Sequence, residues 1–265
     1  MRPPNPPQPF TAATTVPQVI QAVAGFAAWC EANASRLGYF AALYLRITKA
    51  VQAALTQGSV FQNDELLAQL DVTFANRYLT ALNGYFYPQQ FPGLSRCWLA
   101  SFTGAEAAGH SIVQYTLSGV AAHIGLDLGI ATQQVCGSPT NLGQFQGDFN
   151  QINTVLFQQV QTVLGEIDAE SPVLADLYAV LGKHEMALID DGLGGSRDVA
   201  WNLANTLAGQ VPAQQELTVA AQDTLVAGVI PVLFTPPVPL DTIVQLIAKQ
   251  ENQDAGAVIA ELLQK

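Results

Sequence analysis

Apolar residues recur at every third or fourth position along nearly the whole chain, and almost no stretch alternates with a period of two. The clearest example has a strict four-residue step: Tyr39, Leu43, Ile47, Val51 and Leu55. Side chains at this spacing share one face of an α-helix, whereas a half-buried β-strand needs an alternating pattern. The sequence therefore predicts an all-α fold, a single bundle of roughly nine or ten helices.

Capping residues, prolines and glycines indicate where these helices begin and end. We expect helices over residues 16–32, 37–55, from Asn63 or Asp64 to a stop at Pro88, 105–132, 149–167, 172–189, 197–207 and 214–234, the last broken at Pro231. The glycine-rich segment 136–147 is expected to be a loop long enough to cover a cavity, and Asp148 can cap the helix that follows.

Four glycines, Gly109, Gly119, Gly125 and Gly129, interrupt the apolar segment 105–132. Each costs a helix roughly 1 kcal/mol relative to alanine. Their presence predicts that a neighbouring helix or a ligand approaches this segment closely.

The chain divides at its prolines. Residues 1–15 form a Pro-rich arm, expected to be extended and poorly ordered, and residues 16–234 form the helical domain. Residues 235–265 begin with the linker Thr235-Pro-Pro-Val-Pro239 and continue as a helical hairpin. This hairpin is too small for a domain of its own, so we expect it to dock on the bundle.

The charge balance limits the partners that the chain can have. Ten Lys and Arg against 21 Asp and Glu give a net charge of -11, the wrong sign for nucleic-acid phosphates or anionic lipid. The most apolar window, 224–234, is about 11 residues, against roughly 20 for a membrane span. We expect neither nucleic-acid binding nor a span.

The start of the chain and its cysteines favour one compartment. The first residues lack the basic and apolar regions of a secretory signal. Three cysteines without a C-x-x-C spacing are typical of reduced thiols. We therefore expect a cytoplasmic protein.

The most informative polar residues are His123 and Asp127, in an otherwise apolar, glycine-bearing helix. Four positions apart, they face the same way and point into the protein interior. A buried carboxylate without a partner is very costly, so this pair marks either a site or a packing contact.

Three interpretations of the pair stay open. His123 and Asp127 can be ligands of one divalent metal, since imidazole and carboxylate one turn apart can chelate. They can be a metal-free acid–base pair, in which the carboxylate orients the imidazole. They can also be a structural pair, bonded to Arg197, a backbone carbonyl or an Asn, that fixes helix packing.

At this motif the sequence resembles a family of all-helical, mostly bacterial proteins of unknown function. The resemblance rests on Ala122-His-Ile-x-Leu-Asp-Leu128, Asp148-Phe149, Ile152-Asn153 and Ser196-Arg-Asp-Val-Ala-Trp201, and extends upstream to Arg77-Tyr-Leu79 and Trp98. It implies an all-helical fold and shared positions at His123, Asp127, Asp148, Asn153, Arg197 and Trp201. It supplies no reaction.

The same helix is weakly similar to the His-x-x-x-Asp helix of zinc-dependent phospholipases C. In that family both residues bind zinc. Here Asp127 is followed by Leu128-Gly129-Ile130 rather than by a turn with another His, and His110, His123 and His184 are too few for a three-metal cluster. The similarity therefore implies at most one metal.

Other residues can complete a site around the pair. Arg197 is one of only ten cations and is expected in the first turn of a helix, where a positive charge opposes the helix dipole. A buried carboxylate, Asp127 or Asp148, is its expected partner. Tyr78, Trp98 and Trp201 can line an apolar pocket, although such aromatic stripes are usually core.

The leading hypothesis is an enzyme that acts by hydrolysis, elimination or cyclisation on a largely apolar small molecule. His123 would be the acid–base group or metal ligand and Asp127 its orienter or co-ligand. Asp148 and Arg197 would complete the catalytic cluster, and Asn153, Trp201, Tyr78 and Trp98 would bind the ligand. The alternative is a non-catalytic bundle that holds a lipid-like or terpenoid molecule. A third is a structural role in a homo-oligomer, marked by exposed apolar helix faces.

Overall fold

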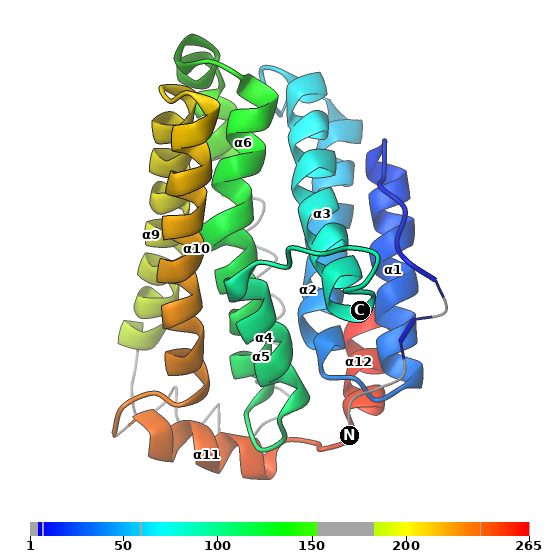
Figure 1. Ribbon diagram of the computed structural model, residues 1–265. Helices are drawn as coiled ribbons and strands as arrows, with labels where there is room; N and C mark the ends of the chain where they lie inside the picture. Colours follow the sequence, from blue (N-terminus) through cyan, green and yellow to red (C-terminus); the bar gives the residue numbers. More distant parts are fainter. Residues whose placement is uncertain (1–4, 7, 59, 153–182, 239, 265) are drawn as a thin grey trace.

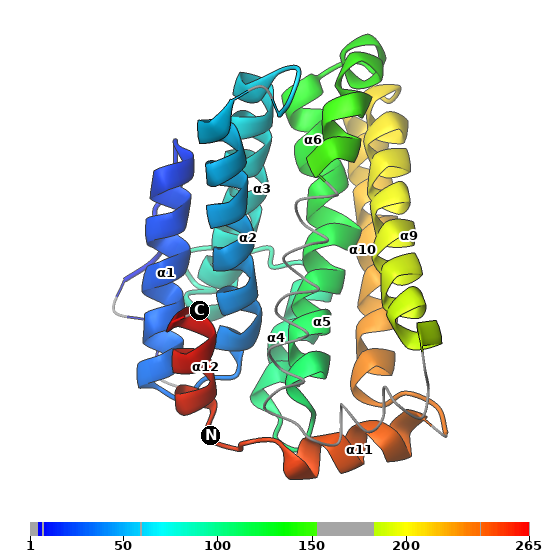
Figure 2. The same ribbon diagram turned by 180° about the vertical axis from the view of Figure 1, so that it is seen from behind.

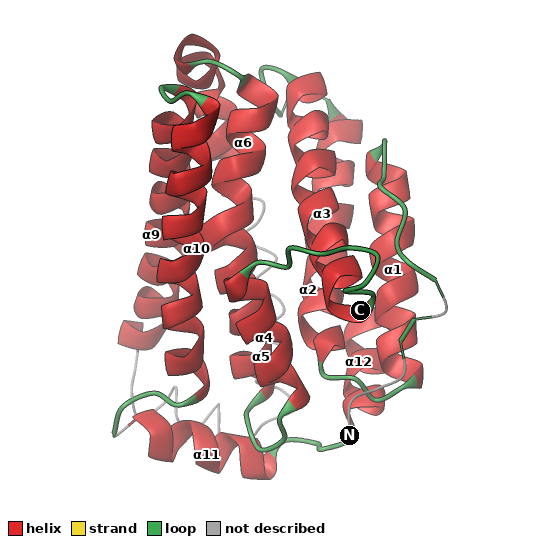
Figure 3. Cartoon of the chain, viewed as in Figure 1, coloured by secondary structure: helices red, strands yellow, loops and turns green. Residues whose placement is uncertain are grey.

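The computed structural model describes residues 5–6, 8–58, 60–152, 183–238 and 240–264, without the side chains of 183–194 and 196. These residues hold ten α-helices of defined bounds, one π-helix and no β-strand, which confirms the all-α prediction (Figures 1 and 3). The bounds are α1 (Val16–Ala32), α2 (Leu37–Gln57), α3 (Asp64–Phe86), α4 (Arg96–Glu106), α5 (Ile112–Ala122), η1 (His123–Leu128), α6 (Gly129–Cys136), α9 (Lys183–Ala208), α10 (Pro212–Phe234), α11 (Leu240–Gln250) and α12 (Ala255–Gln264).

The helices form an elongated bundle. Helices α1, α2 and α3 lie on one side and α9 and α10 on the other, with α4, α5 and α6 between them (Figures 1 and 2). Helix α10 packs on α4 and α5, and α6 packs on α9 and α3. Helix α11 lies across one end of the bundle, and α12 packs against α1 and α2.

Short polar side chains cap the N-termini of several helices. They accept hydrogen bonds from backbone N–H groups of the first turn, which have no partner within the helix. Asn63 caps α3 by accepting the N–H of Leu66, so the first of the two predicted caps is confirmed. Ser111 caps α5 in a reciprocal pair with Gln114.

The segment expected as one helix from 105 to 132 is two. Helix α4 ends at Glu106, and the chain turns at Gly109, whose φ of 97° suits glycine. From Ile112 to Cys136 the chain is then helical without a break, and its centre, His123–Leu128, is a π-helix. Such widened turns within α-helices are frequent at functional sites.

The other glycines of this segment sit where neighbouring helices approach, as predicted. A Cβ on Gly129 would lie 2.6 Å from the backbone oxygen of Ala200 in α9. A Cβ on Gly119 would lie 2.4 Å from the ring of Phe40 in α2. Both side-chain positions are therefore occupied by a neighbouring helix.

The predicted loop at 136–147 is wrong. Gly137, with a φ of 72°, ends α6, but residues 139–152 are helical. Buried Leu142, Phe145 and Phe149 drive this helix, because the free energy of their burial exceeds the cost of two glycines. Asp148 therefore lies inside a helix and does not cap one.

Two further helix boundaries differ from the prediction. Helix α9 runs unbroken through its glycines, so Arg197 lies in its interior rather than in a first turn. Helix α10 continues through Pro231 to Phe234. The predicted helix 149–167 and the start of the predicted helix 172–189 lie largely outside the described residues.

Helix α10 is 23 residues long and, by length and hydropathy, could cross a membrane. The expectation of no membrane span, which rested on the shorter window 224–234, stays a prediction. In the structure α10 packs on the bundle: Gln222 donates to the backbone oxygen of Gly125, and Asp223 accepts the N–H groups of Arg96 and Cys97. Its exposed side carries large apolar side chains: Leu217, Leu225, Val229 and Val232.

The N-terminal arm lies along α3. The side-chain amide of Asn83 bonds both the N–H and the C=O of Phe10, at 2.7 and 2.8 Å. Asn76, two turns earlier, bonds the N–H and C=O of Ala13 in the same way, at 2.7 and 2.9 Å. The described part of the arm is therefore extended, as predicted, but held in place.

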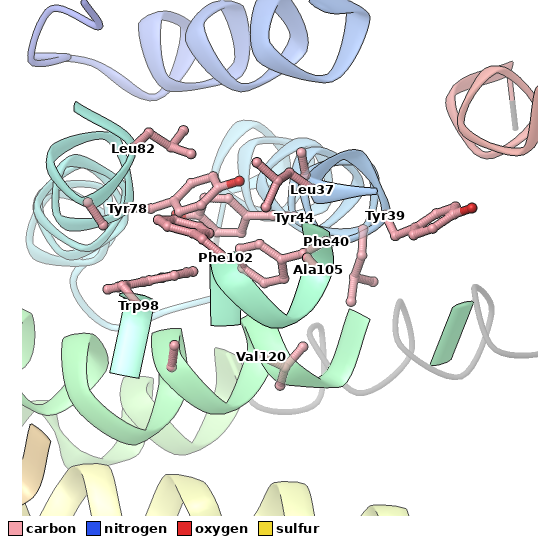
Figure 4. Packing of buried hydrophobic residues seen from close by; sticks show 14 of the residues in the cluster. Leu37, Tyr39, Phe40, Tyr44, Tyr78, Leu82, Trp98, Phe102, Ala105 and Val120 are labelled. Carbon is pink, nitrogen blue, oxygen red and sulfur yellow. The ribbon is translucent and has the colours of Figure 1, made fainter. Parts of the chain in front are cut away.

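The main core lies between α1, α2, α3, α4 and α5 and is rich in aromatic rings. Phe40 and Tyr44 from α2 meet Tyr78 from α3 and Trp98 from α4, with neighbouring ring centroids 5.1–5.8 Å apart (Figure 4). These four residues surround the candidate site.

Candidate functional site

His123 and Asp127 contact each other in the π-helix. The Nδ1 atom of His123 lies 3.1 Å from Oδ2 of Asp127, and each residue is only 2% exposed. This contact confirms that the two side chains face the same way. A single hydrogen bond between them fixes the plane of the imidazole ring.

Asp127 has two more partners, on other helices. Arg77 of α3 donates from Nε to Oδ1 at 2.8 Å, and Trp98 of α4 donates from Nε1 to Oδ2 at 2.8 Å. The prediction that Arg197 is the cationic partner of Asp127 is therefore wrong, because Arg77 takes this place. Asp127 therefore joins α3, α4 and η1 at one point.

The surroundings set the charges of the pair. Burial raises the pKa of Asp127, but the Arg77 charge and the His123 and Trp98 hydrogen bonds outweigh it, so the net shift is downward. Burial lowers the pKa of His123 and outweighs the opposing effect of Asp127. At neutral pH the pair is thus a carboxylate and a neutral imidazole.

This charge state fixes the tautomer of His123. The carboxylate of Asp127 only accepts, so Nδ1 carries the proton and Nε2 carries a lone pair. Among the residues that the structure describes, Nε2 has no hydrogen-bond partner, although it is buried. A positioned imidazole with a free Nε2 can accept a proton.

Aromatic rings enclose His123. Phe74 stacks on the imidazole with ring centroids 3.6 Å apart, and Tyr44 meets it edge-on at 4.7 Å. The ring centroids of Phe40, Tyr78 and Trp98 lie 5.8–5.9 Å from that of His123. Tyr78 and Trp98 were predicted to line a ligand pocket. They are only 1% and 2% exposed, so both belong to the hydrophobic core.

Phe74 and Tyr44 also line a small cavity, which we call the inner hollow. Its volume is about 40 Å³. Its walls are Tyr44, Ile47, Val51, Leu67, Leu70, Asp71, Phe74, Leu128, Ile152 and Arg197. It lies between α2, α3, η1 and α9, and residue 152 closes part of its wall.

Polar atoms without partners surround this hollow. Within the described chain, Oδ2 of Asp71, Nε and Nη2 of Arg197 and the hydroxyl of Tyr44 are buried and make no hydrogen bond. The nearby Thr48 hydroxyl donates to the backbone oxygen of Tyr44 instead, at 2.9 Å. Buried polar groups are almost always bonded, so such a set at one cavity is a candidate binding site.

On its other side the pair borders an open cleft of about 320 Å³. Arg77, Asp127 and Trp98 lie at its inner wall, and residues 90–95 of the loop before α4 form its rim. The Arg77 side chain is 27% exposed here. Asp127 therefore borders this cleft, whereas His123 is linked to the inner hollow only through the rings of Phe74 and Tyr44, which line the hollow and contact the imidazole.

The remaining predicted site residues lie apart from the pair. Both carboxylate oxygens of Asp148 accept backbone N–H groups, from Gln62 and Asn63 at 2.7 and 2.8 Å. Asp148 therefore holds the α2–α3 connection and does not bond Arg197. Trp201, half-buried, packs on Phe149 at 4.7 Å. Asn153 lies outside the described residues.

The other two histidines are also separate from the pair. His110 lies in the α4–α5 turn, beside Phe234 and Tyr115. The side chains of His184 and Glu185 lie outside the description. In the described part of the chain no group of three His, Cys, Asp or Glu side chains could hold a metal.

Three residues at this site were missed: Arg77, Asp71 and Tyr44. Arg77 could have been recognised because the chain has only ten cations. Any of these ten, and not Arg197 alone, could be the partner of a buried carboxylate. Asp71 lies between Leu67 and Phe74 on the apolar face of α3, where a carboxylate is unexpected. Tyr44 carried no such signal, because an aromatic residue on an apolar stripe predicts core.

The fold and site define an all-α bundle protein with a buried His–Asp pair beside an apolar cavity. By its sequence the chain belongs to a family of unknown function (DUF5995), which matches residues 16–236. Comparisons with curated proteins and with solved structures found no match.

Proposed function

We propose that the protein is an enzyme in which His123 acts as a general base on a small, largely apolar molecule in the inner hollow. The observation that carries the proposal is the unpartnered, buried Nε2 of His123, whose ring is fixed through Nδ1 by Asp127. Asp127 is a positioning residue: it sets the tautomer and stabilises the imidazolium that forms when Nε2 takes a proton.

Tyr44 supplies a complementary hydrogen-bond donor. Its ring lies edge-on to His123, its hydroxyl is unpartnered, and it lines the inner hollow. Burial raises the pKa of Tyr44 well above its usual range, so this hydroxyl stays protonated. A neutral base beside a protonated phenol suits a reaction in which one proton is removed and another is returned. Hydrolysis, elimination and cyclisation all include such steps.

The geometry supports this proposal without a metal. The Nδ1 and Oδ2 atoms bond each other, and Oδ1 is engaged by Arg77. A metal bound by both side chains would have to replace these contacts, and a catalytic zinc ion also needs a third protein ligand.

The size of the inner hollow argues against a non-catalytic lipid or terpenoid carrier at this place. Pockets for ligands of that size have several hundred Å³. The inner hollow, at about 40 Å³, takes only a small molecule or one end of a larger one.

The test is turnover by the whole protein. Purified wild type, His123→Gln and the control His110→Gln are incubated with a small-molecule cell extract, and consumed and new masses are recorded by mass spectrometry. We expect turnover by wild type and by His110→Gln and its loss in His123→Gln, with all three folded by circular dichroism. Equal turnover by His123→Gln, or a ligand that wild type binds but never changes, would contradict the proposal.

Asp127→Asn tests the positioning role on any substrate so found. The side-chain amide introduced at position 127 can donate a hydrogen bond to Nδ1 of His123. This favours the tautomer with the proton on Nε2, which can no longer act as a base. We expect kcat to fall with little change in KM, and the pH profile to shift because the carboxylate no longer supports the imidazolium. A purely structural residue would alter stability and leave the pH profile of the remaining activity unchanged.

A further inference from the structure

Arg197 is a buried cation without an anion. It is 6% exposed, and its Nε and Nη2 atoms have no hydrogen-bond partner. Its guanidinium lies over the ring of Phe149 at 5.3 Å. In the described chain no carboxylate lies within 4 Å of it, and nearby Asp148 is occupied by backbone N–H groups.

This charge persists at neutral pH. Burial lowers the pKa of Arg197 to about 9, which still leaves the side chain protonated at pH 7. A buried charge is strongly unfavourable unless it is paired, and a guanidinium pairs best with a planar, bidentate anion. Arg197 is one of the residues that line the inner hollow, so an anion in this hollow would lie beside its side chain.

The inner hollow selects the size of that anion. One water molecule needs about 10–15 Å³ by the same measure, so about 40 Å³ admits a few heavy atoms. The walls beside Arg197 are aliphatic, with Leu67, Leu70 and Ile152 among them. A carboxylate with a short hydrocarbon tail fits this lining better than a phosphate, whose further oxygens would meet no donors there.

Asp71 limits the charge of the ligand. It lines the same hollow, and its Oδ2 is unpartnered. Ionised, it would repel a second negative charge, and protonated, it offers one hydrogen bond. The hollow therefore suits a monoanion.

We propose that the inner hollow binds a short-chain aliphatic carboxylate, with the carboxylate on Arg197 and the tail against Leu67, Leu70 and Ile152. The proposal of this binding site does not depend on the proposed enzymatic function. It rests on the proposed function only in the further statement that such an acid, free or as one end of a substrate, is what His123 acts on.

The probes are acetate, propionate, butyrate and hexanoate, with butyramide as the neutral match for butyrate. Binding to the full chain is measured by calorimetry and by saturation-transfer NMR at pH 7. We expect propionate and butyrate to bind and to raise the melting temperature, hexanoate to bind more weakly because of its length, and butyramide not to bind. Equal binding of butyrate and butyramide, or binding of no carboxylate, would overturn the proposal without any variant.

Arg197→Gln is expected to weaken butyrate binding at least tenfold, and Lys49→Gln, which removes an exposed cation from α2, to leave it unchanged. Arg197→Lys keeps the positive charge but loses the planar pair of N–H donors of the guanidinium. We expect its affinity for butyrate to lie between those of wild type and Arg197→Gln. Should Arg197→Gln fail to fold, the comparison of Arg197→Lys with wild type decides. Unaltered affinity for butyrate in a folded Arg197 variant would show that Arg197 does not bind the carboxylate.

The same samples separate the two proposals. Butyrate that binds through Arg197 and is recovered unchanged, with no His123-dependent turnover of any extract component, would support the site and contradict the enzyme. Turnover that depends on His123, without carboxylate binding, would support the enzyme and contradict the site.

Discussion

The carboxylate of Asp127 accepts the Nε–H of Arg77 at 2.8 Å, although the two residues are 50 positions apart in the chain. Both residues line the open cleft of about 320 Å³ that borders residues 90–95, and Asp127 is also bonded to His123 and Trp98. The ion pair therefore connects the surface of α3 to the imidazole in the core.

Removing both partners of this ion pair should destabilise the protein less than the two single changes added together. Arg77→Gln leaves a buried carboxylate uncompensated, and we expect a loss of about 3 kcal/mol or less, since Arg77 is 27% exposed. In Arg77→Gln/Asp127→Asn the loss should be smaller than the sum of the single losses. Urea denaturation of the four proteins measures this coupling; additive losses would show that the pair contributes no interaction of its own.

The contribution of His123 to the stability of the protein should become unfavourable as pH drops below 6.5. The unfolded chain protonates His123 near its ordinary pKa of 6.5, whereas the folded protein, with the lowered pKa, resists protonation to a lower pH. Protons therefore favour the unfolded state in this window. From pH 7 to pH 5, we expect the urea midpoint of wild type to change unfavourably relative to that of His123→Gln, because only wild type carries the contribution of this imidazole. His110→Gln, at a less buried histidine, should behave more like wild type.

Asp71 should have the opposite pH dependence. Burial raises its pKa from 3.8 to about 7, so the unfolded chain releases this proton at a lower pH than the folded protein does. Stability is thus lost as pH rises from about 4 to 7. Asp71→Asn, which stays neutral, should therefore stabilise the protein, by about 2 kcal/mol more at pH 7.5 than at pH 5. Exposed Asp198→Asn is the control, and a gain independent of pH would contradict the assignment.

Elemental analysis tests the metal interpretation directly. We expect that protein purified without chelator contains no metal whose amount depends on His123, because the ligand atoms of the pair are already bonded. The comparison is with His123→Ala. Near-stoichiometric zinc, iron or manganese in wild type that is lost in this variant would favour one bound divalent ion.

Gly129 and Gly143 should respond in opposite ways to alanine. The Cβ at Gly129 would lie 2.6 Å from a backbone oxygen of α9, so the helices must separate, at a cost of about 1–3 kcal/mol. A Cβ at Gly143 meets nothing within 4 Å, and alanine there should gain up to about 1 kcal/mol of helix propensity. Equal effects in chemical denaturation would show that α6 and α9 do not pack this closely.

Local signals predicted most of the fold. The four-residue step and the Asn63 cap located α2 and α3, because capping and periodicity act within a few residues of the chain. Glycine was the ambiguous signal. Gly109 and Gly137 end helices with positive φ, whereas Gly143 and Gly147 lie within one, and only the packing of Phe145 and Phe149 decides between these outcomes.

The site was predictable where its contacts are local. The contact of His123 with Asp127 follows from a spacing of four, and Asp127 was recognised as a buried group that needs partners. The identity of those partners depends on how α3 and α4 cross η1, which no local pattern encodes. Arg77 and Arg197 could therefore not be told apart as partners, although one is bonded to Asp127 and the other faces the inner hollow.

The arm along α3 has a consequence for the order in which the chain becomes fixed during synthesis. Phe10 and Ala13 are held by the side chains of Asn83 and Asn76, 73 and 63 residues further on. The arm leaves the ribosome before α3 and must therefore wait until α3 has emerged and formed before it finds its partners. Phe10 and Ala13 thus dock later than the helices that follow them can form, although they are made before α3.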